Sequence, residues 1–156
     1  MTVNEYLDLY KTGIEVGIIS VDEFEDFIYN EIEKLDNVPY CYIDVLDAVP
    51  KGINEVTKRI SDYFWECRYT QQHVQNSDNV CLIERILIGR IATKYKSGEA
   101  DMKTTIYKLA ELSSYYHPYW ATIRDTFELA EQGYHTSKSV QEELDEVFEM
   151  AVYKYL

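Results

Sequence analysis

The composition of this 156-residue chain is that of a folded and strongly acidic protein, with 46% apolar residues and a net charge of −13. The apolar content excludes a disordered chain, which has too little hydrophobic surface to offset the entropy of ordering. The acidic balance argues against direct binding to nucleic acid or to an anionic membrane, because both require a concentrated basic surface.

The length predicts a single helical domain spanning residues 1–156. No run of about 18 apolar residues occurs, and the first residues carry acids where a secretory signal has basic residues. A soluble cytoplasmic protein is therefore expected. The three cysteines, Cys41, Cys67 and Cys81, are an odd number at wide spacings, which favours reduced thiols in the core over a disulfide framework.

Helix start signals appear early in the chain. Apolar residues recur at helical spacing almost throughout, and strand-like alternation is not sustained. Thr2 with Glu5, and Ser20 with Glu23, have the spacing of capping boxes. These patterns predict a first helix through about Thr12 and a second that begins at Ser20.

Two prolines delimit a short third helix, which Pro39 begins and which ends before Pro50. The stretch INEVTKRISDYFWEC, residues 53–67, predicts a fourth helix because its apolar residues share one face. The polar tract 70–79 is the longest expected loop. The apolar face of the fourth helix consists of Ile53, Val56, Ile60, Tyr63, Phe64 and Cys67.

A fifth helix, residues 80–96, is apolar on two sides and is predicted to be the buried central helix, with Gly98 closing it. The last three helices are expected at residues 99–115, 118–132 and 139–155. Their boundaries are marked by Pro118, Gly133 and Ser139.

The short connections between these helices imply antiparallel neighbours. The sequence thus predicts an all-α fold, a single compact bundle of seven or eight mostly antiparallel helices, with a short helical-repeat stack as the alternative. The Ser-Val-x-Glu openings at Ser20 and Ser139 are shared capping chemistry and do not make a repeat unit.

The second helix separates into two opposite faces when its residues are placed about 100° apart. Glu31 falls within the apolar face, where it either lies at the rim of the core or is buried and paired with a basic residue from the middle third of the chain. The polar face consists of Asp22, Glu25, Asp26, Tyr29, Glu33 and Asp36, and the apolar face of Phe24, Phe27, Ile28 and Leu35.

This carboxylate-rich helix does not match known metal-binding patterns. A calcium loop that starts at Asp22 would need glycine at its sixth position, which is Phe27. None of the three histidines follows a glutamate by three residues, as a di-iron bundle requires. Paired carboxylates for acid–base catalysis need desolvation, which a water-facing stripe does not supply. No metal or cofactor is predicted.

The third helix repeats the arrangement of the second, with tyrosine among acids on its polar face. Fifteen tyrosines is heavy use of a residue that anchors protein interfaces, and the surrounding acids favour a basic partner. The alternative is a pair of ordinary solvated faces. We call the predicted partner-binding surface the acidic tyrosine face; it consists of Asp22, Glu25, Asp26, Tyr29, Glu33, Tyr40, Asp44 and Asp47.

A second aromatic concentration is SSYYHPYW, residues 113–120. Its tyrosines Tyr115, Tyr116 and Tyr119 are a candidate secondary patch of the interface. The alternative is a junction between two helices packed with aromatic side chains and fixed by Pro118. Base stacking on nucleic acid is not expected, because single-strand binders need a basic groove and this segment has little positive charge.

Enzymatic activity is not predicted. Cys67 and His73 are the one cysteine–histidine pair that lies close in sequence, and their spacing does not predict a hydrogen bond between the two side chains. Glycine-rich phosphate loops and the common hydrolase and metalloprotease motifs are absent from the sequence. An enzyme without a recognisable motif stays as the third possibility.

The chain resembles the immunity proteins of bacterial toxin systems, which bind and neutralise a cognate toxin. The resemblance lies in residues 17–48, GIISVDEFEDFIYNEIEKLDNVPYCYIDVLDA, and in its small, acidic, tyrosine-rich character. SYYHPYW is similar to the tyrosine pair that precedes proline in nuclease-colicin immunity proteins, but here His117 intervenes and the chain is longer. The resemblance implies that the acidic tyrosine face binds a basic toxin such as a nuclease. A helical adaptor for another protein is the alternative function.

Overall fold

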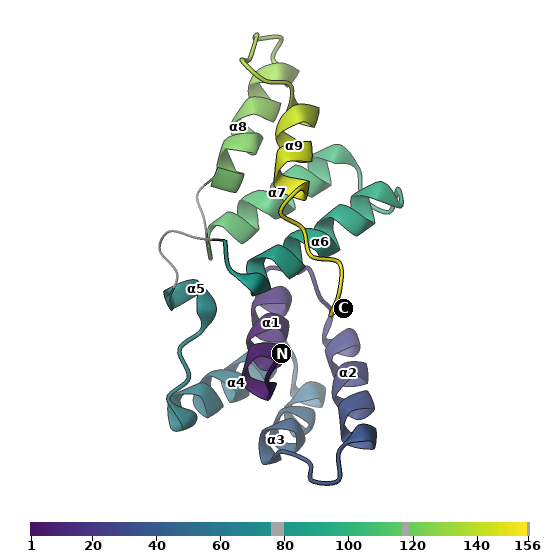
Figure 1. The fold of residues 1–156 in the computed structure, drawn as a ribbon, viewed down its shortest axis with the longest axis vertical. Coiled ribbons are helices and arrows are strands. Elements are labelled where there is room, and N and C mark those ends of the chain that lie inside the picture. Colours follow the sequence, from purple (N-terminus) through teal and green to yellow (C-terminus); the bar gives the residue numbers. More distant parts are fainter. Residues whose placement is uncertain (76–79, 117–118, 156) are drawn as a thin grey trace. The chain divides into compact units, whose positions relative to one another are not determined.

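The chain is all-helical, as predicted (Figure 1). The computed structural model describes residues 1–75, 80–116 and 119–155, apart from the side chains of residues 75 and 119–121, and no strand occurs in these ranges. The chain divides into two compact units, Met1–Gln71 and Gln72–Leu156, each described by itself below. The single-domain organisation stays a prediction.

In the N-terminal unit, α4 contacts both α1 and α3, and α2 contacts α3. Its buried apolar side chains include Phe24 and Ile28 from the apolar face of the second helix. The elements of this unit are α1 (Val3–Glu15), α2 (Val21–Lys34), α3 (Tyr40–Ala48), the 3-10 helix η1 (Val49–Lys51) and α4 (Ile53–Cys67).

The predicted caps form the ends of α1 and α2. The Thr2 hydroxyl accepts a hydrogen bond from the Glu5 backbone N–H, and the Glu5 carboxylate accepts one from the Thr2 N–H at 2.7 Å. Ser20 accepts from the Glu23 N–H at 3.1 Å. The first helix ends at Glu15, one turn later than predicted, and Leu35 lies outside the core because it ends α2 and is 38% exposed.

In the C-terminal unit, α7 contacts α6 and α8, and α9 contacts α8 and α6. The predicted central helix is confirmed, because eight of the fifteen residues of α6 are buried. A one-turn helix, α5, lies in the tract predicted to be a loop. The elements are α5 (Gln72–Gln75), α6 (Leu82–Lys96), α7 (Met102–Ser113), α8 (Tyr119–Glu131) and α9 (Val140–Phe148). Pro118, predicted to begin the seventh helix, lies outside the described residues.

The last predicted helix was too long. It ends at Phe148 rather than at residue 155, and the segment after it runs along α6. The Val152 backbone N–H donates to the Arg85 carbonyl at 2.9 Å, and Arg85 Nε donates to the Met150 carbonyl at 2.9 Å. Gly89 leaves the room that the Val152 backbone occupies. Hydrogen bonds to α6 thus replace the last turns of the predicted helix.

Candidate partner-binding face

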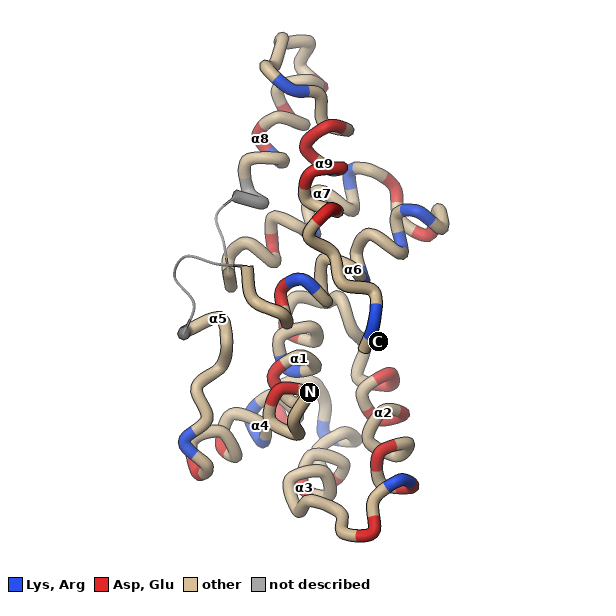
Figure 2. Tube along the Cα trace, in the orientation of Figure 1, with Lys and Arg blue, Asp and Glu red and all other residues tan. Residues whose placement is uncertain are grey.

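The outer face of α2 is set by the aromatic packing on its inner face. Phe27 stacks on Tyr10 with ring centroids 4.5 Å apart and also contacts Tyr6 at 5.0 Å, while Phe24 and Ile28 are fully buried. With a period of 3.6 residues, this packing turns the polar stripe of α2 away from the core. Figure 2 shows acidic residues recurring along the length of α2.

The carboxylates of this stripe are mostly exposed to solvent. Asp22, Asp26 and Glu33 are exposed and Glu25 is half-buried. Among the described residues, none of these four side chains is in an ion pair or hydrogen bond. Tyr29 is 52% exposed and lies one helical turn from Glu25 and Asp26 on one side and from Glu33 on the other. The outer surface of α2 therefore presents a tyrosine ring surrounded by carboxylates whose charge no ion pair offsets in the described residues.

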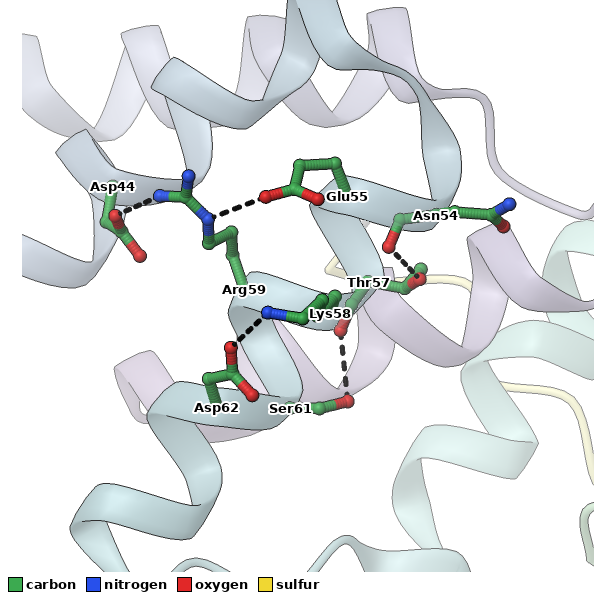
Figure 3. A network of polar contacts seen from close by, with 8 residues as sticks. All are labelled: Asp44, Asn54, Glu55, Thr57, Lys58, Arg59, Ser61 and Asp62. Carbon is green, nitrogen blue, oxygen red and sulfur yellow. Dashed lines mark hydrogen bonds and ion pairs between the residues drawn. The ribbon is translucent and has the colours of Figure 1, made fainter.

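The polar face of α3 differs from that of α2 in its charge. Tyr40 is 80% exposed and Asp47 is exposed, as a binding role would require. Asp44 instead forms an ion pair with Arg59 of α4, whose Nε donates to Glu55 at 3.0 Å (Figure 3). Asp44 is therefore the residue of the acidic tyrosine face whose negative charge is offset by a cation of the same protein.

The α4 network shown in Figure 3 contains two cations of this unit, Lys58 and Arg59, and pairs both with acids. The Arg59 guanidinium has a raised pKa because of the hydrogen bonds to Glu55 and Asp44. Lys58 pairs with Asp62 at 3.0 Å, and this hydrogen bond raises the pKa of the Lys58 ammonium. Both cations are thus engaged by acids of α3 and α4.

Glu31 is at the rim of the core. Its side chain is 24% exposed, and it accepts from Lys34 Nζ at 3.0 Å, three residues along the same helix. Of the two predicted positions for Glu31, the rim agrees with the structure. The pairing cation comes from its own helix and not from the middle third of the chain.

The secondary patch is engaged in contacts within its own unit. Tyr115 and Tyr116 are half-buried, and each ring meets His73 of α5 edge to face with centroids 5.8 Å apart. The Tyr119 side chain lies outside the described part of the structure. The two described tyrosines therefore pack against α5, and both the interface role and the helix-junction role of this segment stay predictions.

Sequence reasoning missed Trp65, which is 86% exposed. It follows the buried Phe64 on α4 and so points away from the core. Its position on the helical wheel, outside the apolar stripe of Val56, Ile60 and Phe64, is the signal that could have identified it.

Sequence reasoning also missed a buried carboxylate. Asp8 of α1 is fully buried and accepts hydrogen bonds from the Tyr69 hydroxyl and from Gln71 Nε2, both at 3.0 Å. These two partners are more than sixty positions away, while the Thr12 hydroxyl of the same helix also donates to Asp8 Oδ1, at 3.5 Å. The sequence around Asp8 does not indicate the two distant contacts.

The prediction of core thiols was wrong for Cys67. Cys41 is buried, but Cys67 is exposed because it is the last residue of α4. Cys81 is half-buried and caps α6, with its Sγ accepting from the Glu84 backbone N–H at 3.5 Å. All three cysteines are free thiols.

The described residues include no group of three or more His, Cys, Asp or Glu side chains placed to hold a metal ion. Within the same ranges, the helices are too short or too polar to cross a membrane. Comparisons with protein-family models, with curated proteins and with solved structures found no match to this chain.

Proposed function

We propose that this protein is a non-enzymatic binding protein whose acidic tyrosine face takes up a basic protein. The observation that carries the proposal is the exposed Tyr29 ring among four α2 carboxylates that have no cationic partner within the described part of the chain. Together with the resemblance to immunity proteins, it leads us to a basic bacterial toxin, such as a nuclease, as the partner that the protein neutralises in the cytoplasm.

The energetics of α2 support this proposal. Asp22 and Asp26 are four residues apart, a spacing at which like charges destabilise a helix by about 0.2–0.5 kcal/mol. A partner that brings cations to this face relieves the repulsion and gains attraction. The acids also speed the encounter with a basic protein, while a tyrosine supplies a large contact area with a polar tip.

The N-terminal unit carries most of the charge that such a partner would meet. Residues 1–71 contain fifteen acidic and six basic residues, whereas residues 72–156 contain thirteen and nine. The net charges are −9 and −4. The longer-range attraction of a basic protein is therefore strongest toward the unit that bears α2 and α3.

The test is capture of a partner from the source cells by immobilised protein. We expect the wild type to retain a basic protein that the double variant Asp22→Lys/Asp26→Lys loses. The matched control is Asp125→Lys/Glu131→Lys, which changes the net charge equally at two exposed acids of α8. Equal retention by both double variants, at unchanged helicity, would refute binding through the acidic tyrosine face.

The captured protein then separates immunity from the adaptor alternative. Expressed alone, a toxin stops cell growth, and co-expression of the wild-type protein restores it. We expect the Asp22→Lys/Asp26→Lys variant to fail in this rescue and the α8 control to succeed. A captured partner that is harmless when expressed alone would favour the helical adaptor.

A further inference from the structure

The outer side of α3 carries an apolar pair that the sequence analysis did not single out. Tyr40 is 80% exposed and Ile43 is 42% exposed, and they lie about one turn apart on the same side of the helix. Asp47, also exposed, follows one turn after Ile43. The rotation of α3 is fixed from its inner side, where the buried Tyr42 ring meets Phe27 of α2 edge to face with centroids 6.3 Å apart. We call Tyr40, Ile43 and Asp47 the α3 ridge.

The free charge of the α3 ridge is confined to its end. Asp44, on the same side of the helix, has its charge offset by Arg59. Asp47 is the second-last residue of α3 and has no ion pair in the described part of the chain, even with Lys51 four positions later. The negative end of the helix dipole also favours a cation at this point. The ridge therefore begins with an apolar pair and ends at a position that attracts a cation.

The kind of segment that fits this ridge follows from helix geometry. Backbone groups in the middle of a helix bond to one another, so α3 offers side chains and not the free backbone groups with which an extended strand pairs. A helix of the partner also makes its contacts through side chains, and its turns repeat every 5.4 Å or about that, as those of α3 do. Its apolar side chains can lie on Tyr40 and Ile43 while a lysine or arginine one turn further meets Asp47.

Electrostatics argue against a second copy of this chain as the occupant. The N-terminal unit has fifteen acidic and six basic residues, a net charge of −9, and α3 itself contains two acids and no basic residue. Two copies that met through α3 would bring like charges together, whereas a basic segment is attracted to the same surface.

We propose that the α3 ridge docks an amphipathic helix of the basic partner, with apolar side chains on Tyr40 and Ile43 and a lysine or arginine at Asp47. This inference rests on the proposed function and adds a separate role for α3. The carboxylates of α2 speed the encounter, and the apolar pair of α3 slows dissociation of the docked helix. A basic protein without such a helix should bind weakly.

The experiment uses two synthetic peptides of equal length and equal leucine and lysine content. In the striped peptide the leucines recur with a helical period and form one apolar face, and in the permuted peptide they do not. Each is titrated into the isotopically labelled full-length protein while amide signals are followed by NMR. We expect the striped peptide to shift the signals of Tyr40, Ile43 and Asp47. It should bind roughly tenfold more tightly than the permuted peptide, because only its leucines can be buried together on α3.

A matched pair of variants locates the apolar contact. Ile43→Ala should weaken binding of the striped peptide roughly tenfold and leave the permuted peptide unchanged. Ile53→Ala is the control, because Ile53 is 53% exposed at the start of α4 in the same unit, and it should change neither affinity. The inference is overturned if the two peptides bind alike, if neither binds, or if the two alanine variants behave alike.

A charge variant keeps this test separate from that of the proposed function. Asp22→Lys/Asp26→Lys should weaken both peptides equally, because it removes an attraction that two equally charged peptides share. If this effect occurs without the Ile43→Ala effect, the α3 ridge alone is refuted. If only the Ile43→Ala effect occurs, the ridge stands and the role of the α2 carboxylates is refuted.

Discussion

Gly89 of α6 lies directly against the backbone of Val152: a Cβ atom added to Gly89 would overlap the Val152 carbonyl oxygen. The same segment donates its Val152 N–H to the Arg85 carbonyl of α6. Because Gly89 has no side chain, the segment after α9 can form a hydrogen bond with α6, the central helix of this unit.

Gly89→Ala should destabilise the protein by about 1–3 kcal/mol, the usual cost of forcing an extra methyl group into a packed site. The displaced segment should lose the Val152 hydrogen bond, so hydrogen exchange at the Val152 amide should accelerate. Gly13→Ala is the control for the exchange rate, because the nearest atoms that its Cβ meets belong to the Ile19 side chain, with Cδ1 at 2.5 Å, so it should leave exchange at the Val152 amide unchanged. An unchanged Val152 exchange rate in Gly89→Ala would contradict the backbone overlap at Gly89.

Tyr63 should make stability depend on alkaline pH. Burial raises the pKa of Tyr63 to about 12 from 10.0, so the folded state favours the neutral phenol. Its contribution is fully present below pH 10 and is lost as the pH rises through about 12. The unfolding free energy of Tyr63→Phe should fall less steeply than that of the wild type over this range. Because both proteins keep Cys41 and Tyr42, parallel curves would show that Tyr63 is not responsible.

Asp26→Lys should stabilise the isolated protein at low ionic strength. It replaces the repulsion between Asp22 and Asp26 with an acid–lysine pair at the favourable spacing, worth about 0.2–0.5 kcal/mol. The gain should shrink in 1 M salt, where the Debye length is about 3 Å. Chemical denaturation by urea at two salt concentrations measures it. A loss of stability at low salt would mean that Asp26 has a structural partner.

The capping serines test whether the chain unfolds as one domain. Ser20→Ala and Ser139→Ala each remove a side-chain cap, at α2 and α9, and should cost about 1 kcal/mol. A single-domain chain unfolds in one transition, so both variants should shift the same midpoint in a thermal melt. Two transitions, each moved by one variant only, would contradict the single-domain prediction. Ser61→Ala, exposed on α4, is the control and should change stability by less than about 0.5 kcal/mol.

Tyr29→Ala and Tyr40→Ala should each weaken binding of the captured partner by roughly 1–3 kcal/mol, mainly through faster dissociation, because aromatic anchors act after docking. Changing Asp22 to lysine should instead slow association and reduce its dependence on salt. Surface plasmon resonance separates the two rates. If both alanine variants dissociate like the wild type, the tyrosines are not anchors.

Local signals explain what could be predicted of the fold. The capping residues Thr2, Ser20 and Ser139 act on backbone groups within three positions, so their helices could be located from the sequence. The end of the last helix could not, because it depends on Gly89, some sixty positions away. Capping by Cys81 is local as well, but cysteine is an unusual cap and was not recognised.

The same distinction applies to the acidic tyrosine face. Helical spacing was enough to place Tyr29 and its neighbouring carboxylates on the exposed side of α2. It did not reveal that Asp44 pairs with Arg59, because that contact depends on how α3 and α4 pack. Periodicity gives the direction in which a side chain points, whereas its partner is decided by tertiary structure.

The buried carboxylate of Asp8 has an evolutionary consequence. Tyr69 and Gln71, both half-buried, direct their donor groups at its two oxygens, and the Thr12 hydroxyl donates to the same carboxylate at 3.5 Å. Replacing Asp8 alone removes the acceptor that these donors share, so the effect of a change at residue 8 depends on which residues stand at positions 12, 69 and 71. Descendants of this chain should therefore show correlated substitutions at these four positions.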